Sequence, residues 1–494
     1  MEIEFKLSCT PETANVLTRQ LSRLTGSSPQ KLKLQNTYYD TPQQGLRAAG
    51  IALRIRQLDR QRLQTVKCAG QVSGGLSSRP EWETPYSGRF DFTPISDEAT
   101  RTVLETLARL PGYQAMLDTN FSRHVWHWRP EAETHVEIVL DRGQILAGGR
   151  QEAICELELE LIAGKPERLL DLVAHLGSLA PVFPAPLSKA TRGSLLLTGS
   201  NKPMLAKPAA AEDAATAFQV LAQTCLDQIS LNLPANCARF TAENVHQVRV
   251  NLRRLRALLE LFQPLLRKHW CLDEIKTGAR EHMQALASAR SLQVLLDDIV
   301  RPVTDELSAS TKRKLEQRIG AMVEISFGAA REHLLSHEFA NWLLHTSLAL
   351  HARPTRAQAL QNSWPKSGSH LLTPHIKAYA KQLKKTKLTP ESLHAIRKAG
   401  KHLRYQLDAT ALTKTRHGKQ VARRLAQLQE CLGQFNDLYS AADTLNRQPR
   451  SYAATIAAIG ASHVARHAAL LAEIPEHMTS LRHDLRTLLA QLKE

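Results

Sequence analysis

Two segments of the chain alternate strictly between charged and apolar residues, and this alternation constrains the fold more than any other feature. They are Met1-Glu2-Ile3-Glu4-Phe5-Lys6-Leu7 and Cys155-Glu156-Leu157-Glu158-Leu159-Glu160-Leu161. Successive side chains of a β-strand point to opposite faces, so each segment predicts a strand with one charged and one apolar face. Either segment alone is typical of an amphipathic strand with a solvated face. Together, their carboxylates and one ammonium group favour a bound hard metal ion beside an anion.

The size and charge of the chain indicate two parts with different partners. At 494 residues it is long enough for two or more domains that each bury a core. Residues 1–200 carry 23 Lys and Arg against 22 Asp and Glu, whereas residues 201–494 carry 41 against 25. The second part is a strong cation, so we expect its partner to be a polyanion: nucleic acid, an anionic membrane surface or a phosphate polymer.

The sequence also constrains location. No stretch approaches the roughly 20 apolar residues of a membrane span. The first strand is charged and has no apolar signal-peptide core. The seven cysteines show no CxxC or zinc-type spacing, so reduced thiols are expected. We therefore expect a cytoplasmic protein without a membrane partner.

The hydrophobic periodicity changes near residue 198. Before it, period-two patterns predict strands at 2–8, 33–39, 50–58, 62–69, 80–86, 121–129, 134–140, 142–147 and 153–162. Helices are predicted at 11–24, 97–109 and 166–179. Asp141-Arg142-Gly143 and Gly148-Gly149 are turn signals that separate hairpins. About eight antiparallel strands with charged inner faces predict a barrel with a polar lumen.

Beyond this region the pattern becomes helical. Residues 201–213 contain two prolines and little periodicity, which predicts a linker, and the following segment is rich in Ala, Leu, Arg, Gln and His. The predicted fold class is therefore α+β. Residues 1–200 would form an eight-stranded antiparallel β tunnel with flanking helices, and residues 214–494 an all-α helical bundle made of two repeats.

An internal repeat supports the second part of this prediction. His246, Arg249, Arg253 and Arg256 have the same spacing as His394, Arg397, Lys401 and Arg404, which follow 148 residues later. At about 100° per residue, each set forms a basic stripe on one helix face. Apolar stripes run beside them, formed by Val248, Leu252, Leu255 and Leu259 and by Ile396, Leu403 and Leu407. Gly400 replaces one leucine of the second stripe, and since glycine weakens a helix by roughly 1 kcal/mol, a close helix contact is expected there.

Like charges on one helix face have two explanations. The first is a solvated surface, and the second is a bound polyanion. Each like-charged pair one turn apart costs roughly 0.2–0.5 kcal/mol. Because that cost recurs on two equivalent helices, we favour the polyanion.

Basic residues also recur in the predicted barrel. If their strand faces point inward, the lumen holds cations opposite carboxylates, and arginine and lysine are the side chains that grip phosphate oxygens. The alternative for any single one is a surface position. These residues are Lys6, Arg54, Arg56, Lys67, Arg123, Lys189 and Arg192. Glu81, Glu83, Glu137 and Asp141 alternate inward in the same way and could orient the cations or assist a metal.

Five motifs in order resemble the CYTH family of triphosphate tunnel metalloenzymes. They are the ExExK start, Tyr38-Tyr39-Asp40-Thr41, the LRIR strand, the ELELE strand and the SKATRG segment. Residues from about 214 to 490 resemble the CHAD domain, a helical duplication that binds polyphosphate. Ser291 and Gln293 depart from the aspartates usual in the first CHAD repeat, whereas Asp437 keeps one in the second. A CYTH domain followed by a CHAD domain is similar to bacterial inorganic triphosphatases.

This resemblance implies metal-dependent hydrolysis of inorganic triphosphate to diphosphate and phosphate. Mg²⁺ or Mn²⁺ would be held by Glu2, Glu4, Glu156 and Glu158, with Glu160 as a second choice. The seven basic residues of the lumen would clamp the substrate, and Glu4, Glu158 and Lys6 would be catalytic. A carboxylate of the cluster would deprotonate the attacking water, while positioning and cation density would supply most of the rate. The two basic stripes would bind inorganic polyphosphate.

Two alternatives stay open. The chain could be chiefly a polyphosphate- or nucleic-acid-binding protein with a degenerate tunnel, although the intact carboxylate strands argue against degeneration. It could also act on an organic triphosphate, as thiamine triphosphatase or adenylate cyclase does within the same family. Nucleic acid is disfavoured, because base stacking needs aromatic side chains and Tyr405 is the only aromatic residue within the basic stripes. No GxxxxGK[ST] loop is present either, which disfavours a P-loop nucleotide site.

Overall fold

The computed structural model describes residues 2–109, 112–199, 211–237, 239–268, 270–303, 309–352, 354–384 and 388–492. The chain divides into two compact units. One comprises Met1–Lys207, Leu226–Phe240 and Leu334–Leu348, and the other comprises Pro208–Cys225, Thr241–His333 and Ala349–Glu494. All but the last three residues of the predicted 201–213 linker lie outside the described residues, and the domain limits remain predictions. No helix in the described residues is long and apolar enough to cross a membrane.

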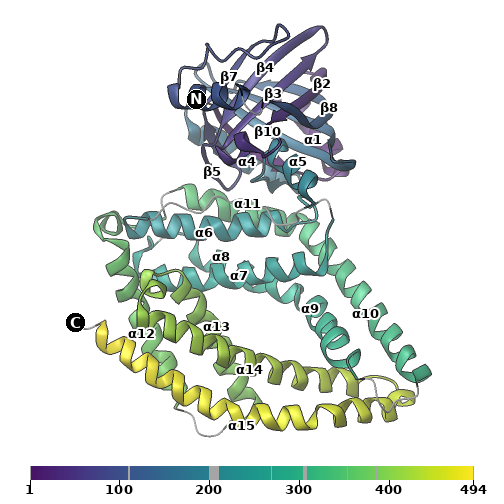
Figure 1. Cartoon of the computed structure of the whole chain (residues 1–494), viewed down its shortest axis with the longest axis vertical. Coiled ribbons are helices and arrows are strands. Elements are labelled where there is room, and N and C mark those ends of the chain that lie inside the picture. Colours follow the sequence, from purple (N-terminus) through teal and green to yellow (C-terminus); the bar gives the residue numbers. More distant parts are fainter. Residues whose placement is uncertain are drawn as a thin grey trace. The chain divides into compact units, whose positions relative to one another are not determined.

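Figure 1 shows strands in the early part of the chain and helices after it. The strands are β1 (Glu2–Ser8), β2 (Gln30–Asp40), β3 (Ile51–Leu58), β4 (Gln61–Cys68), β5 (Gln71–Ser73), β6 (Leu76–Arg79), β7 (Glu81–Pro85), β8 (Gln114–Trp128), β9 (His135–Ala147), β10 (Arg150–Ala163) and β11 (Phe183–Pro184). The helices beside them are α1 (Pro11–Thr25), α2 (Gly45–Ala48), α3 (Glu98–Arg109), α4 (Pro166–Leu179) and α5 (Lys189–Thr198). The later helices are α6 (Ala214–Leu231), α7 (Ala242–Phe262), α8 (Leu272–Ala285), α9 (Ala287–Val294), α10 (Ala309–Leu335), α11 (His337–His351), α12 (Trp364–Gln382), α13 (Pro390–Asp408), α14 (Arg416–Asn446) and α15 (Ala453–Gln491).

The strands form one antiparallel sheet that curls into a nearly closed barrel, as predicted. Its order is β5-β6-β1-β10-β9-β8-β2-β3-β4-β7, and β11 pairs with β1. Only Pro80 separates β6 from β7. Since β6 pairs with β1 (Glu2 opposite Arg79) and β7 pairs with β4 (Lys67 opposite Glu81), this stretch of chain joins the two edges. Within the described residues, β6 and β7 taken as one strand complete a ring of eight.

One strand prediction is wrong. The turn expected at Asp141-Arg142-Gly143 does not form, and β9 runs unbroken from His135 to Ala147. Gly143 is needed inside the strand for another reason: a Cβ there would lie 2.0 Å from the Asn120 carbonyl oxygen on β8. The close approach of two backbones explains this glycine. The other signal, Gly148-Gly149, does form the turn to β10, with φ values of 56° and 73°.

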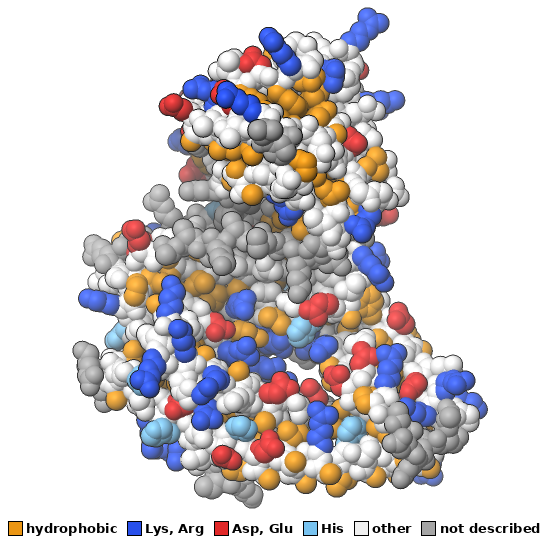
Figure 2. Space-filling view, viewed as in Figure 1, with side chains coloured by type: hydrophobic (Ala, Val, Ile, Leu, Met, Phe, Trp, Pro, Cys, Tyr) orange, Lys and Arg blue, Asp and Glu red, His pale blue; other side chains and the backbone are white. Residues whose placement is uncertain are grey.

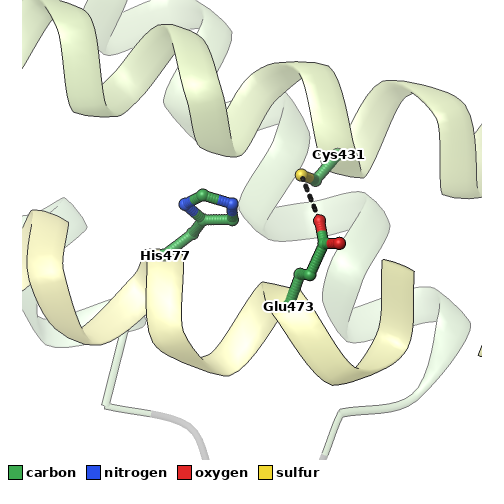
Figure 3. Close-up of side chains that lie close together, drawn as sticks. All are labelled: Cys431, Glu473 and His477. Atoms are coloured by element: carbon green, nitrogen blue, oxygen red, sulfur yellow. Dashed lines mark hydrogen bonds between the residues drawn. The ribbon is translucent and has the colours of Figure 1, made fainter. Parts of the chain in front are cut away.

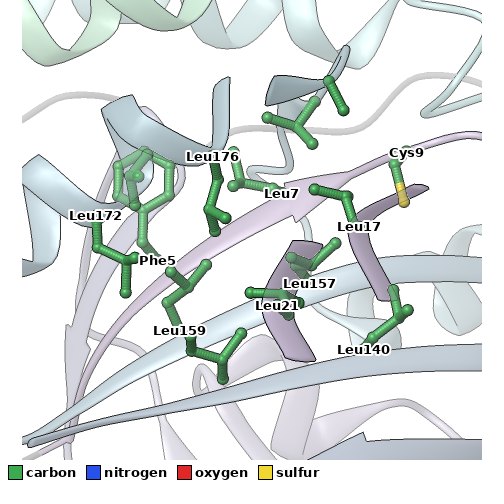
Figure 4. Close-up of a cluster of buried hydrophobic side chains, with 14 of the residues drawn as sticks. Phe5, Leu7, Cys9, Leu17, Leu21, Leu140, Leu157, Leu159, Leu172 and Leu176 are labelled. Carbon is green, nitrogen blue, oxygen red and sulfur yellow. The ribbon is translucent and has the colours of Figure 1, made fainter. Parts of the chain in front are cut away.

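The apolar faces of β1 and β10 point outward against helices. Phe5 and Leu7 of β1 and Leu157 and Leu159 of β10 are fully buried in one hydrophobic cluster. The cluster also contains Leu17 and Leu21 of α1 and Leu172 and Leu176 of α4 (Figure 4). Burying each such side chain stabilises the fold by about 1.5–3 kcal/mol. Because the apolar faces of β1 and β10 pack against these helices, their charged faces must line the lumen.

The two predicted basic helices of the helical unit bury their apolar stripes. Every member of the two apolar stripes on α7 and α13 is buried. The helices contact one another, since Gln406 Nε2 donates to the Ala257 carbonyl oxygen at 3.3 Å. A Cβ on Gly400 would lie 2.2 Å from Gln429 Nε2 and 2.5 Å from Tyr379 Oη. The close contact expected at this glycine is therefore confirmed.

Candidate active site

The barrel encloses a cavity of about 280 Å³ in which charged side chains predominate. Its lining includes seven cations, which are Lys6, Arg54, Arg56, Lys67, Arg79, Arg123 and Lys189. It also includes six carboxylates, which are Glu2, Glu81, Glu83, Glu137, Glu158 and Glu160. Six of the seven predicted substrate-binding residues therefore face one space. The exception is Arg192, which binds Glu152 at 2.6 Å and Glu156 at 2.9 Å behind that lining.

The charged side chains of β1 form ion pairs with one another and with side chains of the neighbouring strands β6 and β10. Lys6 Nζ lies 3.1 Å from Glu4 and 3.4 Å from Glu158, which stands opposite it on β10. Arg79 forms ion pairs with Glu2 and Glu4, and Ser77 Oγ donates to Glu4 Oε1 at 2.9 Å. Burial lowers the pKa of Lys6, but the two carboxylates outweigh it and raise that pKa overall. The ExExK strand thus presents a lysine that stays charged.

A second cluster surrounds Lys189. Its Nζ lies 2.8 Å from Asp141, 2.5 Å from Glu156 and 3.1 Å from Glu158. Arg123 adds a contact of 2.8 Å to Asp141 and one of 3.0 Å to Glu158. Lys189 lies at the start of α5, where Ser188 caps the helix by accepting a hydrogen bond from the Thr191 amide. A helix rather than a strand therefore aims this lysine into the carboxylates.

Acids predominate at another part of the lining. Glu160 stands opposite Glu4 on β1 and Glu137 on β9. Burial, with Glu2 and Glu137 nearby, raises the pKa of Glu160 to about 7. Like charges across neighbouring strands destabilise a sheet. This carboxylate can therefore gain or lose a proton near neutral pH.

Two arginines lie close together on β3. Burial and the neighbouring Arg54 lower the pKa of Arg56 to about 10, although Glu83 lies 3.3 Å away. Nε and Nη2 of Arg54 are buried and have no hydrogen-bond partner among the described residues. Its third nitrogen, Nη1, donates to Tyr38 Oη at 3.4 Å. Glu81 lies 3.8 Å from Nη2, beyond hydrogen-bond distance. A buried guanidinium with unmade hydrogen bonds is costly unless an anion accepts them.

Arg79 is a site residue that sequence reasoning missed. It lines the cavity and contacts two of the predicted metal-binding carboxylates, Glu2 and Glu4. The signal was present, because Arg79 shares the period-two alternation of Glu81 and Glu83. Pro80 concealed it by ending the hydrogen-bonding run of one strand and starting the next.

The predicted basic stripes of α7 and α13 converge with α9. Burial together with Arg253 and Arg290 lowers the pKa of Arg249 to about 10. Burial, Arg397 and Arg253 lower the pKa of Lys401 to about 7. These shifts mean that the cations lie close enough to repel one another. Many Lys and Arg side chains are visible over the helical part of the chain, several around a hollow near its middle (Figure 2).

Several donors on these stripes have no partner. The Nε atoms of Arg253, Arg256 and Arg397 are buried and make no hydrogen bond within the described parts of the chain. Arg249 instead donates to the carbonyl oxygens of Leu286 and Ala287, both at 2.8 Å. The remaining stripe residues have other neighbours: His394 contacts Asn436 at 2.7 Å, Arg404 approaches Asp408, and His246 approaches Arg290. The stripes therefore form a surface of repelling cations with vacant donors.

Comparisons with known families match both parts of the chain. Residues 1–194 match the CYTH domain, and residues 220–446 match the CHAD domain. The chain carries a CYTH domain followed by a CHAD domain. An inorganic triphosphatase from Haemophilus influenzae is 36% identical to it over 197 residues, which cover 40% of this chain and 54% of that protein. The chain thus aligns with about half the length of this curated relative.

Two solved structures also align with parts of the chain. A Hippeastrum protein reported to have a dominant triphosphatase activity aligns with 41% of this chain and 98% of its own, at 20% identity and a TM-score of 0.32. The CHAD domain of Ricinus communis aligns with 58% of this chain and 96% of its own, at 25% identity and a TM-score of 0.47.

The CYTH domain has a set of donors that fits a divalent cation. Asp141, Glu156 and Glu158 each offer a carboxylate oxygen, and these atoms lie within 4.8 Å of one another. Hard oxygen donors of this kind suit Mg²⁺ or Mn²⁺. Lys189 places an ammonium group among the same three carboxylates, so the position already favours positive charge. Asp141 joins the predicted ligands Glu156 and Glu158 here, whereas the predicted ligands Glu2 and Glu4 pair with Arg79 and the lysines.

Proposed function

We propose that the CYTH domain hydrolyses inorganic triphosphate to diphosphate and phosphate in a metal-dependent reaction. The observation that carries the proposal is one cavity lined both by Arg54, whose buried Nε and Nη2 make no hydrogen bond within the described residues, and by Glu158 of the carboxylate cluster. A linear triphosphate is a compact polyanion that would satisfy those donors and offset the repulsion between Arg54 and Arg56. The 36% identity to an inorganic triphosphatase over 197 residues supports the same substrate.

The basic residues would bind and orient the substrate. Arg54, Arg56, Lys67 and Arg123 face the cavity from three strands, so they can hold phosphate oxygens on several sides and fix the terminal phosphorus for in-line attack. Lys6, which the carboxylates keep charged, would stabilise the negative charge of the transition state. Arg192 would act indirectly by fixing Glu156.

The carboxylates would divide into two roles. Glu2, Glu4, Glu156 and Glu158, with Asp141, would hold Mg²⁺ or Mn²⁺, which when bound offsets phosphate charge and acidifies water. Burial raises the pKa of Glu158, but Lys189 and Lys6 outweigh it and hold that pKa well below its ordinary value, which makes Glu158 a weak base. Glu160, with a pKa of about 7, is the carboxylate best suited to take the proton from the attacking water. The water oxygen bonds to the terminal phosphorus as the bridging P–O bond breaks and diphosphate leaves.

The CHAD domain would bind inorganic polyphosphate on its two basic stripes. Vacant donors on Arg253, Arg256 and Arg397 support this role, as does the depressed pKa of Lys401. A chain of regularly spaced phosphates could satisfy both stripes at once. The proposal extends to a cytoplasmic location, which fractionation of cells producing the chain would test.

The hydrolytic activity can be tested with purified full-length chain and tripolyphosphate. We expect phosphate release with Mg²⁺ or Mn²⁺ and none with EDTA. Glu158→Gln should reduce the rate at least about 10³-fold, because it removes a charge shared by Lys6, Arg123 and Lys189. Glu105→Gln, at an exposed position of α3, is the matched control and should keep the parent rate. Metal-independent release, or a folded Glu158→Gln variant with full activity, would contradict the proposal.

A further inference from the structure

Three side chains of different chemistry meet between α14 and α15. They are Cys431 on α14 and Glu473 and His477 on α15 (Figure 3). Glu473 and His477 are four residues apart, so they project from the same face of their helix. One sulfur, one oxygen and one nitrogen atom lie within 4.8 Å of one another. The Cys431 thiol donates to Glu473 Oε2 at 3.9 Å.

We propose that Cys431, Glu473 and His477 bind a divalent transition metal, Zn²⁺ foremost, with water in the fourth position. A sulfur, an imidazole nitrogen and a carboxylate oxygen are the donors that Zn²⁺ takes from proteins, and three protein ligands leave one position open. Tetrahedral Zn²⁺ with ordinary bond lengths separates a sulfur from an oxygen ligand by about 3.5 Å. The observed 3.9 Å between Cys431 Sγ and Glu473 Oε2 needs only a small side-chain movement to reach that value.

Charge balance supports a divalent ion. A thiolate and a carboxylate carry two negative charges, and a neutral imidazole adds none, so a bound Zn²⁺ makes the site neutral. Binding forms a sulfur–metal bond, and the thiol proton leaves to solvent. Burial and the neighbouring Glu473 raise the pKa of Cys431, so the metal-free site holds the protonated thiol. The sulfur lies buried on α14, while Glu473 is exposed, which gives an ion an approach from solvent.

The position of the site suggests what the ion does. It joins α14, of 31 residues, to α15, of 39 residues. These helices run antiparallel, and an ion pair of 3.7 Å between Arg424 and Asp484 lies elsewhere along the same interface. A metal bound to Cys431 and His477 would fix the register of the two helices. The softer donors also separate this site from the all-oxygen cluster of the tunnel, which favours Mg²⁺ or Mn²⁺.

Cobalt substitution tests the site directly in the full-length chain. After treatment with EDTA and desalting, the chain is titrated with Co²⁺, which gives a near-ultraviolet charge-transfer band only when a thiolate binds it. We expect one equivalent of Co²⁺ to develop this band and Zn²⁺ to abolish it by competition. Oxygen ligands of the tunnel do not produce a thiolate band, so occupancy there does not interfere.

Variants make the assignment specific. Cys431→Ser should abolish the band, and His477→Ala should weaken Co²⁺ binding more than about 100-fold, since even outer-shell changes cost 10–100-fold. Cys271→Ser is the matched control, because Cys271 is a partly buried cysteine of the same domain outside the site, and it should keep the band. Circular dichroism checks that each variant is folded, and His477→Ala decides the question if Cys431→Ser is not. Absence of the band in the parent chain, its persistence in folded Cys431→Ser, or a Co²⁺ affinity of folded His477→Ala equal to that of the parent overturns the proposal.

Discussion

The tunnel and the CHAD basic stripes both bury cations, yet they place them in opposite electrostatic environments. In the tunnel, carboxylates outweigh burial and raise the pKa of Lys6, Arg79 and Lys189. On the stripes, burial and neighbouring cations lower the pKa of Arg249, to about 10, and of Lys401, to about 7. The tunnel is thus largely self-neutralised, whereas on the stripes the one carboxylate near Arg397 and Lys401, Asp437, does not outweigh burial and the repulsion between cations.

This difference implies two modes of anion binding. A self-neutralised tunnel holds its side chains in place before substrate arrives, which is what catalysis by preorganised charge requires. The stripes instead store repulsion that a bound polyanion would relieve, so their affinity should depend strongly on salt and pH. Arg56 is the tunnel residue closest to the stripe condition, with a pKa lowered to about 10 by burial and Arg54. Substitutions on the stripes and in the tunnel should therefore have effects of different magnitude.

The largest effect should follow charge reversal on the stripes. The double variant Arg253→Glu with Arg397→Glu should weaken polyphosphate binding on the order of 10³-fold, because vacant donors are replaced by repelling carboxylates. Calorimetry at several salt concentrations measures the loss and should show a shallower salt dependence. Arg416→Glu with Lys419→Glu changes the same charge at exposed positions of α14 and is the control. Equal losses in both double variants would show that net charge, rather than the stripes, governs binding.

A smaller effect is expected in the tunnel. Arg56→Ala should lower kcat/KM for tripolyphosphate by about 10²-fold, the usual consequence of removing one preorganised cation from a transition state. Steady-state phosphate release measures it. Arg62→Ala is the control, because Arg62 is exposed and lies over the Tyr86 ring at 4.8 Å. A rate close to that of the parent for Arg56→Ala would place the substrate elsewhere.

Much of the tunnel could be predicted because strand alternation is local. Period two assigns Glu2, Glu4 and Lys6 to one face, and the structure puts that face inward because Phe5 and Leu7 are buried against helices. The same rule misjudged Gly143, whose role depends on the backbone of a neighbouring strand. Strand alternation also cannot predict which distant segments lie close together, such as Glu160 near Glu2 and Glu137.

In the helical half, too, the sequence pattern predicts features of single helices but not the contacts between helices. Spacing identified the two stripes and the close contact at Gly400, since both follow from one helix at a time. It did not reveal that Arg290 of α9 joins Arg249, nor that Cys431 meets a Glu and a His from another helix. Such meetings depend on how helices pack, and periodicity carries no information about the partner helix.

Protonation of Lys401 should make polyphosphate binding depend on pH. With a pKa of about 7 in the free protein, Lys401 is mostly charged at pH 6 and mostly neutral at pH 8. A polyanion binds the charged form and raises this pKa, so affinity should fall about 10-fold between pH 6 and pH 8. Lys401→Arg, which stays charged throughout, should flatten the profile in the same calorimetric assay. An equal fall in parent and variant would assign the dependence to another group, such as a histidine of the stripes.

In the tunnel, Glu160 resembles Lys401 in having a pKa of about 7. Replacing Glu160 should change stability, and this is the smallest of the four effects predicted for the stripes and the tunnel. Its pKa of about 7 in the folded chain exceeds its ordinary 4.5, so the stabilisation linked to its proton is complete below pH 4.5 and lost as pH rises through 7. In EDTA at pH 8, Glu160→Gln should therefore raise the free energy of unfolding by about 1 kcal/mol, allowing for solvent screening. At pH 4 the variant and the parent should unfold alike, and Glu105→Gln should have no effect at either pH. A stability difference that does not change with pH would mean that the glutamine improves packing and that Glu2 and Glu137 do not repel this carboxylate.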